Sequence, residues 1–182
     1  MNTFYSGKEL KQLGLKSYGD NILISKKASL YNPEKLSLGD NVRIDDYCIL
    51  SGDIKLGSYI HISAYCALYG KYGMEMKDFT GLSPRCTIFS ASDDFSGDFL
   101  ISPMTQEAHN HPIKGKVILE AYSQLGANTI VMPNIIIHEG VAVGAMSLVN
   151  KELESWFVYG GIPVKKIKPR NKGLLKFIGD YE

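Results

Sequence analysis

The sequence lacks the features that mark membrane, secreted and nucleic-acid-binding proteins. No apolar run approaches the length of a membrane span, and the first residues show no basic segment followed by an apolar one. The three cysteines cannot all pair within the chain, and a net charge of +1 gives no general attraction to nucleic acid or to an anionic membrane. We therefore expect a reduced, cytoplasmic protein with no membrane insertion and no nucleic-acid partner.

Aliphatic residues recur at every sixth position through most of the chain, whose 182 residues suffice for one domain with its own core. They are Leu38, Ile44, Leu50, Leu56, Ile62, Leu68, Met76, Leu82, Ile88, Leu119, Leu125, Val131, Ile137, Val143 and Val149. Two extra residues before Met76 and a long interruption after Ile88 break the spacing. The fourth position after each is also small or aliphatic, apart from Tyr72, and Gly, Asp, Asn and Ser crowd between as turn residues.

A period of six excludes an α-helix, and a simple hairpin sheet would show a period of two without fixed turns. A solenoid explains the period, because each hexapeptide then supplies one short strand, one turn and one inward side chain. Cys48 and Cys66 are eighteen residues apart, and Cys66 and Cys86 are twenty apart, which is eighteen plus the insertion. We expect the three thiols to stack on one edge as core fillers, with no metal site.

This pattern resembles the hexapeptide-repeat acyltransferase superfamily, whose fold is a left-handed parallel β-helix with three hexapeptides in each triangular coil. The resemblance implies an all-β solenoid over residues 21–170, a homotrimer, and acetyl-CoA or another acyl-CoA as co-substrate. Ser6 and Glu9 fit a capping box, which predicts a helix over about 7–13 within an N-terminal cap of residues 1–20. We expect residues 171–182 to form a tail or short helix.

The same resemblance implies where coenzyme A binds. A pantetheine arm needs a straight groove of backbone amides, and its phosphates need cations. Ala127 and Ala145, eighteen apart, match groove positions of the superfamily, and the C-terminal Gly-Gly-Ile-Pro-Val-Lys run resembles its Gly-x-Pro-Ala-Lys ending, with Val164 in place of Ala. The predicted coenzyme A residues are Gly126, Ala127, Gly144, Ala145, Asn150, Lys165 and Lys168, with Lys166 and Arg170 as second choices.

The long interruption, residues 93–116, is the other candidate functional feature, because loops of this length in compact domains are functional or disordered. Sugar and serine O-acetyltransferases of the superfamily carry a catalytic His where this sequence has Asp93. The run from Ser92 to Gly97 instead resembles nucleotide-linked amino-sugar N-acyltransferases of surface-polysaccharide synthesis. A neutral amine needs less base catalysis than a hydroxyl, and the Asp93–Asp94 pair can hold an ammonium group and accept its proton.

Three histidines compete for a catalytic or substrate-binding role. His61 follows an inward residue on an earlier coil, so it can meet Asp93 only of a neighbouring copy, and its alternative is a plain surface or interface position. His109 and His111 lie within the interruption and are candidates to bind the sugar or act as base. His138 is expected at the surface or near coenzyme A.

The sequence thus predicts acyl-CoA-dependent N-acylation of a nucleotide-linked amino-deoxysugar for lipopolysaccharide or capsule. O-acetylation of a sugar hydroxyl is the alternative, and a zinc carbonic anhydrase is a distant one. The first twenty residues are too short for the Gly-rich domain of a β-helix nucleotidyltransferase. The sugar and the acyl group remain open.

Overall fold

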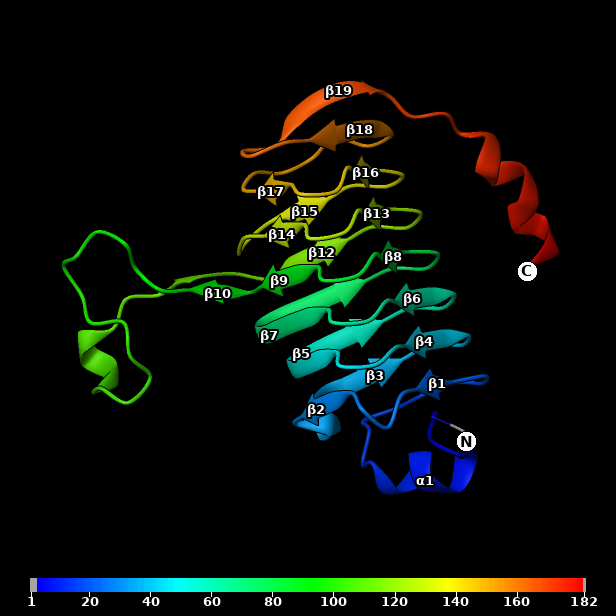
Figure 1. The fold of residues 1–182 in the computed structure, drawn as a ribbon, viewed down its shortest axis with the longest axis horizontal. Helices are drawn as coiled ribbons and strands as arrows, with labels where there is room; N and C mark the ends of the chain where they lie inside the picture. Colours follow the sequence, from blue (N-terminus) through cyan, green and yellow to red (C-terminus); the bar gives the residue numbers. More distant parts are fainter. Residues whose placement is uncertain (1–2, 182) are drawn as a thin grey trace.

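The structure, a computed structural model, describes residues 3–181 and shows a parallel β-helix of stacked triangular coils (Figure 1). One face is a sheet in the order β1 (Leu23–Ile24), β4 (Val42–Ile44), β6 (Ile60–Ile62), β8 (Gly81–Leu82), β13 (Gln124–Leu125), β16 (Ala142–Val143), β18 (Phe157–Gly160) and β19 (Lys165–Pro169). All neighbours in this sheet run parallel except β18 and β19, which form an antiparallel hairpin at the last coil.

The other two faces share one sheet, because the long strands β5 (Ile49–Leu56) and β7 (Ala67–Met76) turn a corner without interruption. Gly52, at φ +95°, makes this turn possible, since a Cβ there would lie 2.6 Å from the backbone of Gly70. The remaining strands of this sheet are β2 (Ser29–Tyr31), β3 (Leu36–Leu38), β9 (Thr87–Phe89), β12 (Val117–Leu119), β14 (Ile130–Val131), β15 (Ile136–Ile137) and β17 (Leu148–Val149).

The six-residue repeat specifies the core as predicted. All fifteen recurring aliphatic or Met residues are buried, and so are Cys48, Cys66 and Cys86, whose thiols face backbone carbonyls in successive coils. Two of the fourth positions differ from the rest, because Tyr72, the exception noted in the sequence, and Ser92 are only partly buried. The two-residue insertion turns Tyr72 outward, and Met74 and Val117 fill that core column beside Ile54.

One corner of the β-helix carries stacked rings instead of the small polar residues expected in turns. We call Tyr59, Phe79, Tyr122 and Trp156 the aromatic ladder; successive ring centroids are 4.7, 5.6 and 6.2 Å apart. Each of the four residues has a φ near +60°, a conformation that costs a non-glycine residue about 1–2 kcal/mol and that the ring contacts help to offset. Gly140 leaves room for Trp156, because a Cβ there would lie 2.4 Å from the indole.

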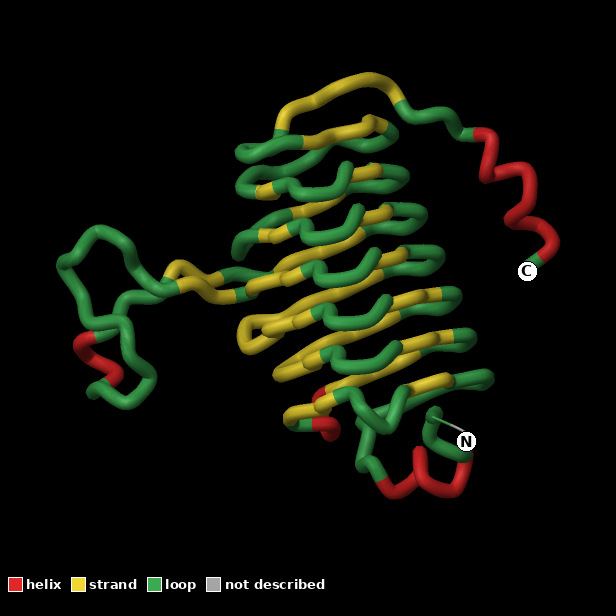
Figure 2. Tube along the Cα trace, in the orientation of Figure 1, coloured by secondary structure: helices red, strands yellow, loops and turns green. Residues whose placement is uncertain are grey.

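Three segments depart from the repeat. The helix α1 (Gly7–Gln12) closes the first coil, and the predicted capping box between Ser6 and Glu9 is present. After β10 (Ala91–Ser92), which pairs antiparallel with β11 (Ile113–Lys114), the chain extends well away from the coils and includes the short helix η2 (Glu107–His109) (Figure 2).

The C-terminal segment, residues 171–181, leaves β19 and carries the helix η3 (Gly173–Asp180). Pro33–Lys35 forms one further short helix, η1. Within residues 3–181 none of the helices is long and apolar enough to cross a bilayer.

Candidate functional site

We call the segment that leaves the coils after β10, residues 93–116, the excursion. Its first two residues carry carboxylates, of which one is hydrogen-bonded and the other is not. Asp94 accepts hydrogen bonds from the backbone N–H of Ser96 at 3.1 Å and from its hydroxyl at 2.5 Å, so it closes a local turn. The bonds from Ser96 also hold the pKa of Asp94 below its usual value. Asp93 is exposed and has no hydrogen-bond or ion-pair partner among the described residues. Of the predicted pair, Asp93 is therefore the carboxylate free to meet a substrate.

His61 lies on β6 with a carboxylate partner that the sequence did not reveal. Its Nε2 is 2.8 Å from Oδ2 of Asp45, and Asp45 also accepts a 2.8 Å hydrogen bond from Nε of Arg43. Partial burial alone would raise the pKa of Asp45, but the bonds from His61 and Arg43 hold it below its usual value. A carboxylate on one ring nitrogen orients the imidazole and leaves Nδ1 for a ligand. The sequence signal was the spacing of sixteen residues between Asp45, directly after β4, and His61 on β6, the next strand of the same sheet.

The other histidines are separated from this pair. His109 and His111 are exposed in the excursion, where the ring of His111 stacks on Phe99 at 4.9 Å. His138 follows β15 and lies between two carboxylates. Its Nδ1 is 3.3 Å from Oε2 of Glu120, and its Nε2 is 2.5 Å from Oε1 of Glu152. Across the described part of the chain, no three His, Cys, Asp or Glu side chains gather as ligands for a metal ion.

Two backbone amides are free among the turns predicted to line a coenzyme A groove. Gly126 packs so closely on the next coil that a Cβ would lie 2.5 Å from the amide nitrogen of Ala145, which confirms that these turns stack. The amides of Gly126 and Gly144 are used between coils, whereas those of Ala127 and Ala145 donate to no acceptor within residues 3–181. Two spare N–H groups one coil apart suit the amide carbonyls of an extended arm.

The hairpin formed by β18 and β19, which we call the lysine hairpin, holds its lysines in two different environments. Lys166 is engaged, since its Nζ is 2.7 Å from Glu154 and 4.0 Å from the ring centroid of Phe157. Lys165 and Lys168 are exposed and form no ion pair with any described carboxylate. These two are therefore free of described carboxylates, and Asn150 is exposed directly after β17.

Two faces of the β-helix differ in their outward side chains. The charged face, formed by β12 and the ends of β5 and β7, holds Glu75 between Lys55 and Lys116 at 3.4 and 2.7 Å. The apolar face, formed by the starts of β5 and β7 with β9, β14 and β17, presents outward residues without charge. These are Ile49, Ala67, Thr87, Ile130 and Leu148, flanked by Tyr31, Tyr69 and Phe89.

In one copy, Asp93 and His61 come from different faces, so their chemistry does not converge within a single chain. Asp93 offers a carboxylate at the base of the excursion, Ala127 and Ala145 offer an amide-lined groove, and the lysine hairpin offers cations at its upper end. Such an arrangement can hold a thioester-bearing nucleotide beside a nucleophile. The aromatic ladder was missed because its rings occupy turn positions outside the inward columns.

Comparison with known proteins identifies the chemistry. No family model matches the chain. It is 39% identical over 171 residues to dTDP-4-amino-4,6-dideoxy-D-glucose acyltransferase of Escherichia coli, covering 92% of this chain and 89% of that enzyme. Crystal structures of AntD, an N-acyltransferase from Bacillus cereus, are 50% identical with a TM-score of 0.97 and cover 100% of this chain and 97% of AntD. They contain coenzyme A with dTDP or dTDP-4-amino-4,6-dideoxyglucose.

A maltose O-acetyltransferase from Clostridium difficile shares the fold alone, at 21% identity and a TM-score of 0.58, with 91% of this chain and 74% of that one covered. The fold is accordingly the left-handed β-helix predicted from the repeat, and the protein is an enzyme of acyl transfer. The chain belongs to the hexapeptide-repeat acyltransferases, in the sugar N-acyltransferase family that includes the Escherichia coli enzyme and AntD.

Proposed function

We propose that this protein transfers an acyl group from acyl-CoA to the amino group of dTDP-4-amino-4,6-dideoxyglucose. The observation that supports it most is the similarity to AntD over the whole chain, because AntD binds that sugar nucleotide and coenzyme A. The free carboxylate of Asp93, at the position where O-acetyltransferases of the superfamily carry a histidine, is consistent with an amine acceptor.

The chemistry follows from the two carboxylates. Asp93 holds the sugar ammonium near the thioester and takes one proton, and the resulting amine attacks the carbonyl carbon. The tetrahedral intermediate collapses to an amide, and the second proton lost by the nitrogen passes to the departing sulfur, so that coenzyme A leaves as the thiol. Asp94, fixed by Ser96, shapes the turn from which Asp93 projects. His61, held by Asp45, is positioned to contact the sugar, with His109 and His111 as further contacts from the excursion.

Coenzyme A is proposed to lie along the turns of Gly126, Ala127, Gly144 and Ala145, with Asn150 beside its arm. The free amides of Ala127 and Ala145 would bond the pantetheine carbonyls, while Lys165 and Lys168 would pair with phosphates. The acyl donor therefore approaches Asp93 from the C-terminal coils, and the acceptor approaches from the N-terminal coils.

Three copies are proposed to assemble through the apolar face, which leaves the charged face in water. The excursion supports this, since Phe95 and Met104 are 85% and 91% exposed in one copy and gain cover only from a neighbour. Such a trimer lets Asp93 of one copy meet His61 of the next. We also propose that the enzyme works in the cytoplasm on a precursor of surface polysaccharide.

The assembly is tested by matched charge substitutions on the two faces. Ile130→Lys on the apolar face should convert trimers to monomers and abolish turnover, whereas Lys55→Glu on the charged face should leave the mass unchanged. Light scattering of both variants decides it. A trimeric Ile130→Lys protein would refute the assignment of the apolar face.

The reaction is tested by following thiol release from acetyl-CoA and 3-hydroxybutyryl-CoA with dTDP-4-amino-4,6-dideoxyglucose, its 3-amino isomer and the corresponding hydroxyl sugars. We expect turnover with the 4-amino sugar only. Turnover with a hydroxyl sugar that disappears in His61→Ala would instead make this an O-acetyltransferase with the His61–Asp45 pair as its base. That second candidate is considered because the pair has the geometry of an oriented base.

A further inference from the structure

The positive charge of this protein is concentrated near one end of the chain. Residues 165–178, which we call the basic end, hold six of the 20 Lys and Arg residues and none of the 19 Asp and Glu residues. The rest of the chain has 14 Lys and Arg against 19 Asp and Glu, a net charge of −5, so the overall charge of +1 conceals a strong asymmetry. Such an asymmetry is typical of a chain that meets an anionic partner.

Four lysines of the basic end are exposed and form no ion pair within residues 3–181. They are Lys165, Lys168, Lys172 and Lys176. Nζ of Lys172 lies 5.1 Å from the ring centroid of Trp156, and Nζ of Lys176 lies 4.7 Å from that of Phe177. The rings hold these two ammonium groups in place but supply no counter-charge. The basic end therefore presents cations that the described part of the fold does not neutralise.

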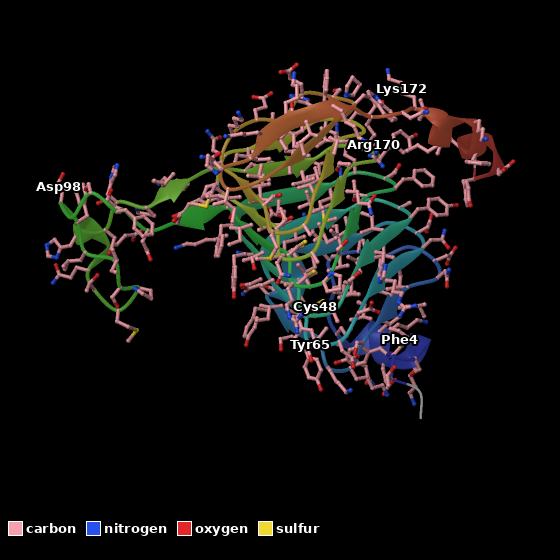
Figure 3. The ribbon with its side chains drawn as sticks, turned by 45° about the horizontal axis from the view of Figure 1, so that its top comes forward. Phe4, Cys48, Tyr65, Asp98, Arg170 and Lys172 are labelled. Atoms are coloured by element: carbon pink, nitrogen blue, oxygen red, sulfur yellow. The ribbon has the colours of Figure 1, made fainter. Side chains whose placement is uncertain are left out.

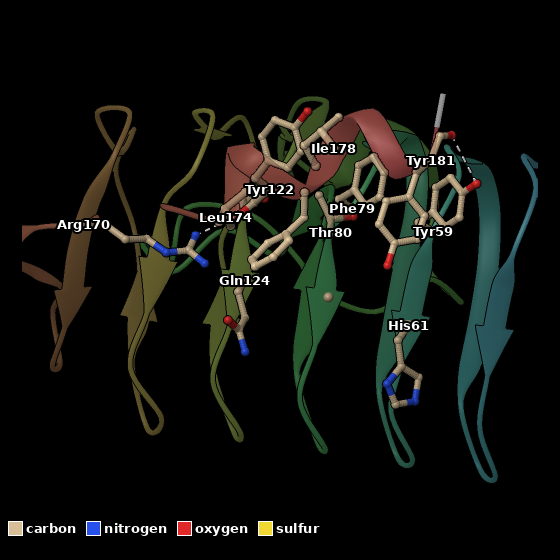
Figure 4. Close-up of a pocket in the computed structure, with 13 residues that line it drawn as sticks. Tyr59, His61, Phe79, Thr80, Tyr122, Gln124, Arg170, Leu174, Ile178 and Tyr181 are labelled. Carbon is tan, nitrogen blue, oxygen red and sulfur yellow. Dashed lines mark hydrogen bonds between the residues drawn. The ribbon is translucent and has the colours of Figure 1, made fainter. Parts of the chain in front are cut away.

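Specific contacts hold the C-terminal segment at both of its ends. Nη1 of Arg170 donates to three backbone carbonyls of the coils, the shortest bond being 2.7 Å to Tyr122, and Lys172 follows directly (Figure 3). At the other end, the ring of Tyr181 meets Tyr59 of the aromatic ladder edge-on at 5.2 Å. Between these anchors a hollow of about 490 Å³ lies between η3 and the ladder, at what we call the aromatic corner (Figure 4).

The helix η3 is amphipathic, yet none of its residues is buried. Its apolar side chains are Leu174, Leu175, Phe177 and Ile178. Leu175 and Phe177 are 39% and 53% exposed, and the other two are only partly buried beside the hollow. One copy of the protein therefore leaves an apolar strip in water next to Lys172 and Lys176. A basic amphipathic helix of this kind is typical of segments that lie on a membrane surface.

The helix η3 also lies away from the excursion and from the face proposed for assembly. The aromatic corner joins the first sheet to the charged face, so it is the corner opposite the apolar face. The excursion leaves a second corner and extends to the opposite side of the molecule (Figure 1), and Ala127 and Ala145 lie at the third corner. In the proposed trimer η3 thus stays accessible. A three-fold rotation keeps its three copies at one height along the axis, where all can meet one flat surface.

We propose that the basic end binds the surface of an anionic lipid bilayer, with its free lysines at the lipid phosphates and Leu175 and Phe177 at the edge of the acyl chains. Each lysine near such a surface strengthens binding roughly fivefold, and three copies in a trimer add avidity. A nucleic acid would also attract the lysines, but it would leave the apolar strip in water. A bilayer surface covers both, and it requires no spanning segment.

The test measures co-sedimentation of the intact protein with vesicles of phosphatidylcholine alone and of phosphatidylcholine mixed with an equal amount of phosphatidylglycerol. We expect binding to the anionic vesicles to be at least about tenfold tighter and to weaken as salt is raised. Lys172→Gln/Lys176→Gln should weaken it at least about tenfold, and Leu175→Asn at least about threefold.

The matched control is Lys8→Gln/Lys11→Gln, which removes the same charge from exposed positions of α1 at the other end of the solenoid. It should change vesicle binding less than about twofold. Turnover without vesicles should be unchanged in all three variants, because none of these side chains belongs to the proposed acyl-transfer site.

Equal binding of the parent to both kinds of vesicle, or to neither, would overturn the proposal. So would equal losses in the Lys172/Lys176 variant and the control, since overall charge would then decide. Tighter binding to duplex DNA than to anionic vesicles would assign the basic end to nucleic acid instead. A lower mass of the Lys172/Lys176 variant in light scattering would assign η3 to contacts between copies. The proposed reaction is tested separately, because vesicle binding needs no substrate: a protein that binds anionic vesicles but acylates no amino sugar would refute the reaction alone.

Discussion

The repeating coils and the segments that interrupt them divide the work of this protein. In the coils, every inward position is buried and almost every backbone group is paired with the coil above or below, so stability accumulates coil by coil. The excursion and the C-terminal segment bury little, yet they carry Asp93, exposed rings and one wall of the hollow at the aromatic corner. The repeat therefore supplies the frame and the proposed coenzyme A groove, and the departures from it supply the proposed acceptor carboxylate.

The sharpest way to test this division is at Asp93. Asp93→Asn removes the free carboxylate but keeps its shape, and we expect kcat/KM to fall about a hundred- to ten-thousand-fold. Unfolding by urea should be unchanged, because the exposed carboxylate of Asp93 has no hydrogen-bond or ion-pair partner within residues 3–181. Asp94→Asn is the matched control and should cost much less, since it loosens a turn. Equal losses for the two would show that the pair acts as a unit.

A substitution in the coils should have the opposite effect, because it should lower the stability of the fold while the folded protein keeps its activity. Leu68→Ala empties part of the core and should lower the free energy of unfolding by about 2–5 kcal/mol. The folded fraction should retain its kcat, measured well below the transition. Tyr72→Ala, at the position that the insertion turns outward, should cost far less. A Tyr72 variant as unstable as Leu68→Ala would contradict the core assignment.

The lysine hairpin combines both roles, because a strand of the solenoid carries the charges that are proposed to bind coenzyme A. Lys165→Gln/Lys168→Gln should raise the Kd for coenzyme A roughly tenfold through lost charge-assisted bonds and leave the Kd for dTDP unchanged. Lys166→Gln, which removes the partner of Glu154, should affect neither ligand. The salt dependence of coenzyme A binding should also become shallower in the double variant.

The smallest expected effect is on the free energy of unfolding, at His138 in the turn after β15. Its hydrogen bond with Glu152 raises its pKa, which partial burial opposes and Glu120 reinforces. The raised pKa means that the imidazolium stabilises the fold fully below about pH 6.5 and loses this contribution as pH rises through the folded-state pKa. His138→Gln should therefore cost more at pH 6 than at pH 9, by less than about 1 kcal/mol. Urea titrations at both values check this, with His109→Gln as the control.

The sequence predicted the solenoid well because hexapeptide periodicity depends on local steric and apolar rules that each repeat restates. The pattern did not show which residues point inward around Tyr72 and Ser92, where an insertion or the exit of the chain shifts the register. The availability of Asp93, as opposed to Asp94, could not be read from the pair itself, because a hydrogen bond to Ser96 separates them. The contact between Asp45 and His61 forms between neighbouring coils. The hollow at the aromatic corner forms between the coils and the C-terminal segment. A pattern within a single repeat encodes neither of them.

The stacking of Trp156 also gives the enzyme its own optical reporter. Trp156 is the sole tryptophan of the chain, it ends the aromatic ladder, and Nζ of Lys172 lies 5.1 Å from the centre of its ring. Light absorbed by Tyr122, whose ring centroid is 6.2 Å from that of the indole, should pass to it by resonance transfer. We expect the emission of Trp156 to change when this corner of the coil is covered, so that fluorescence can report on it without a label or a coupled assay.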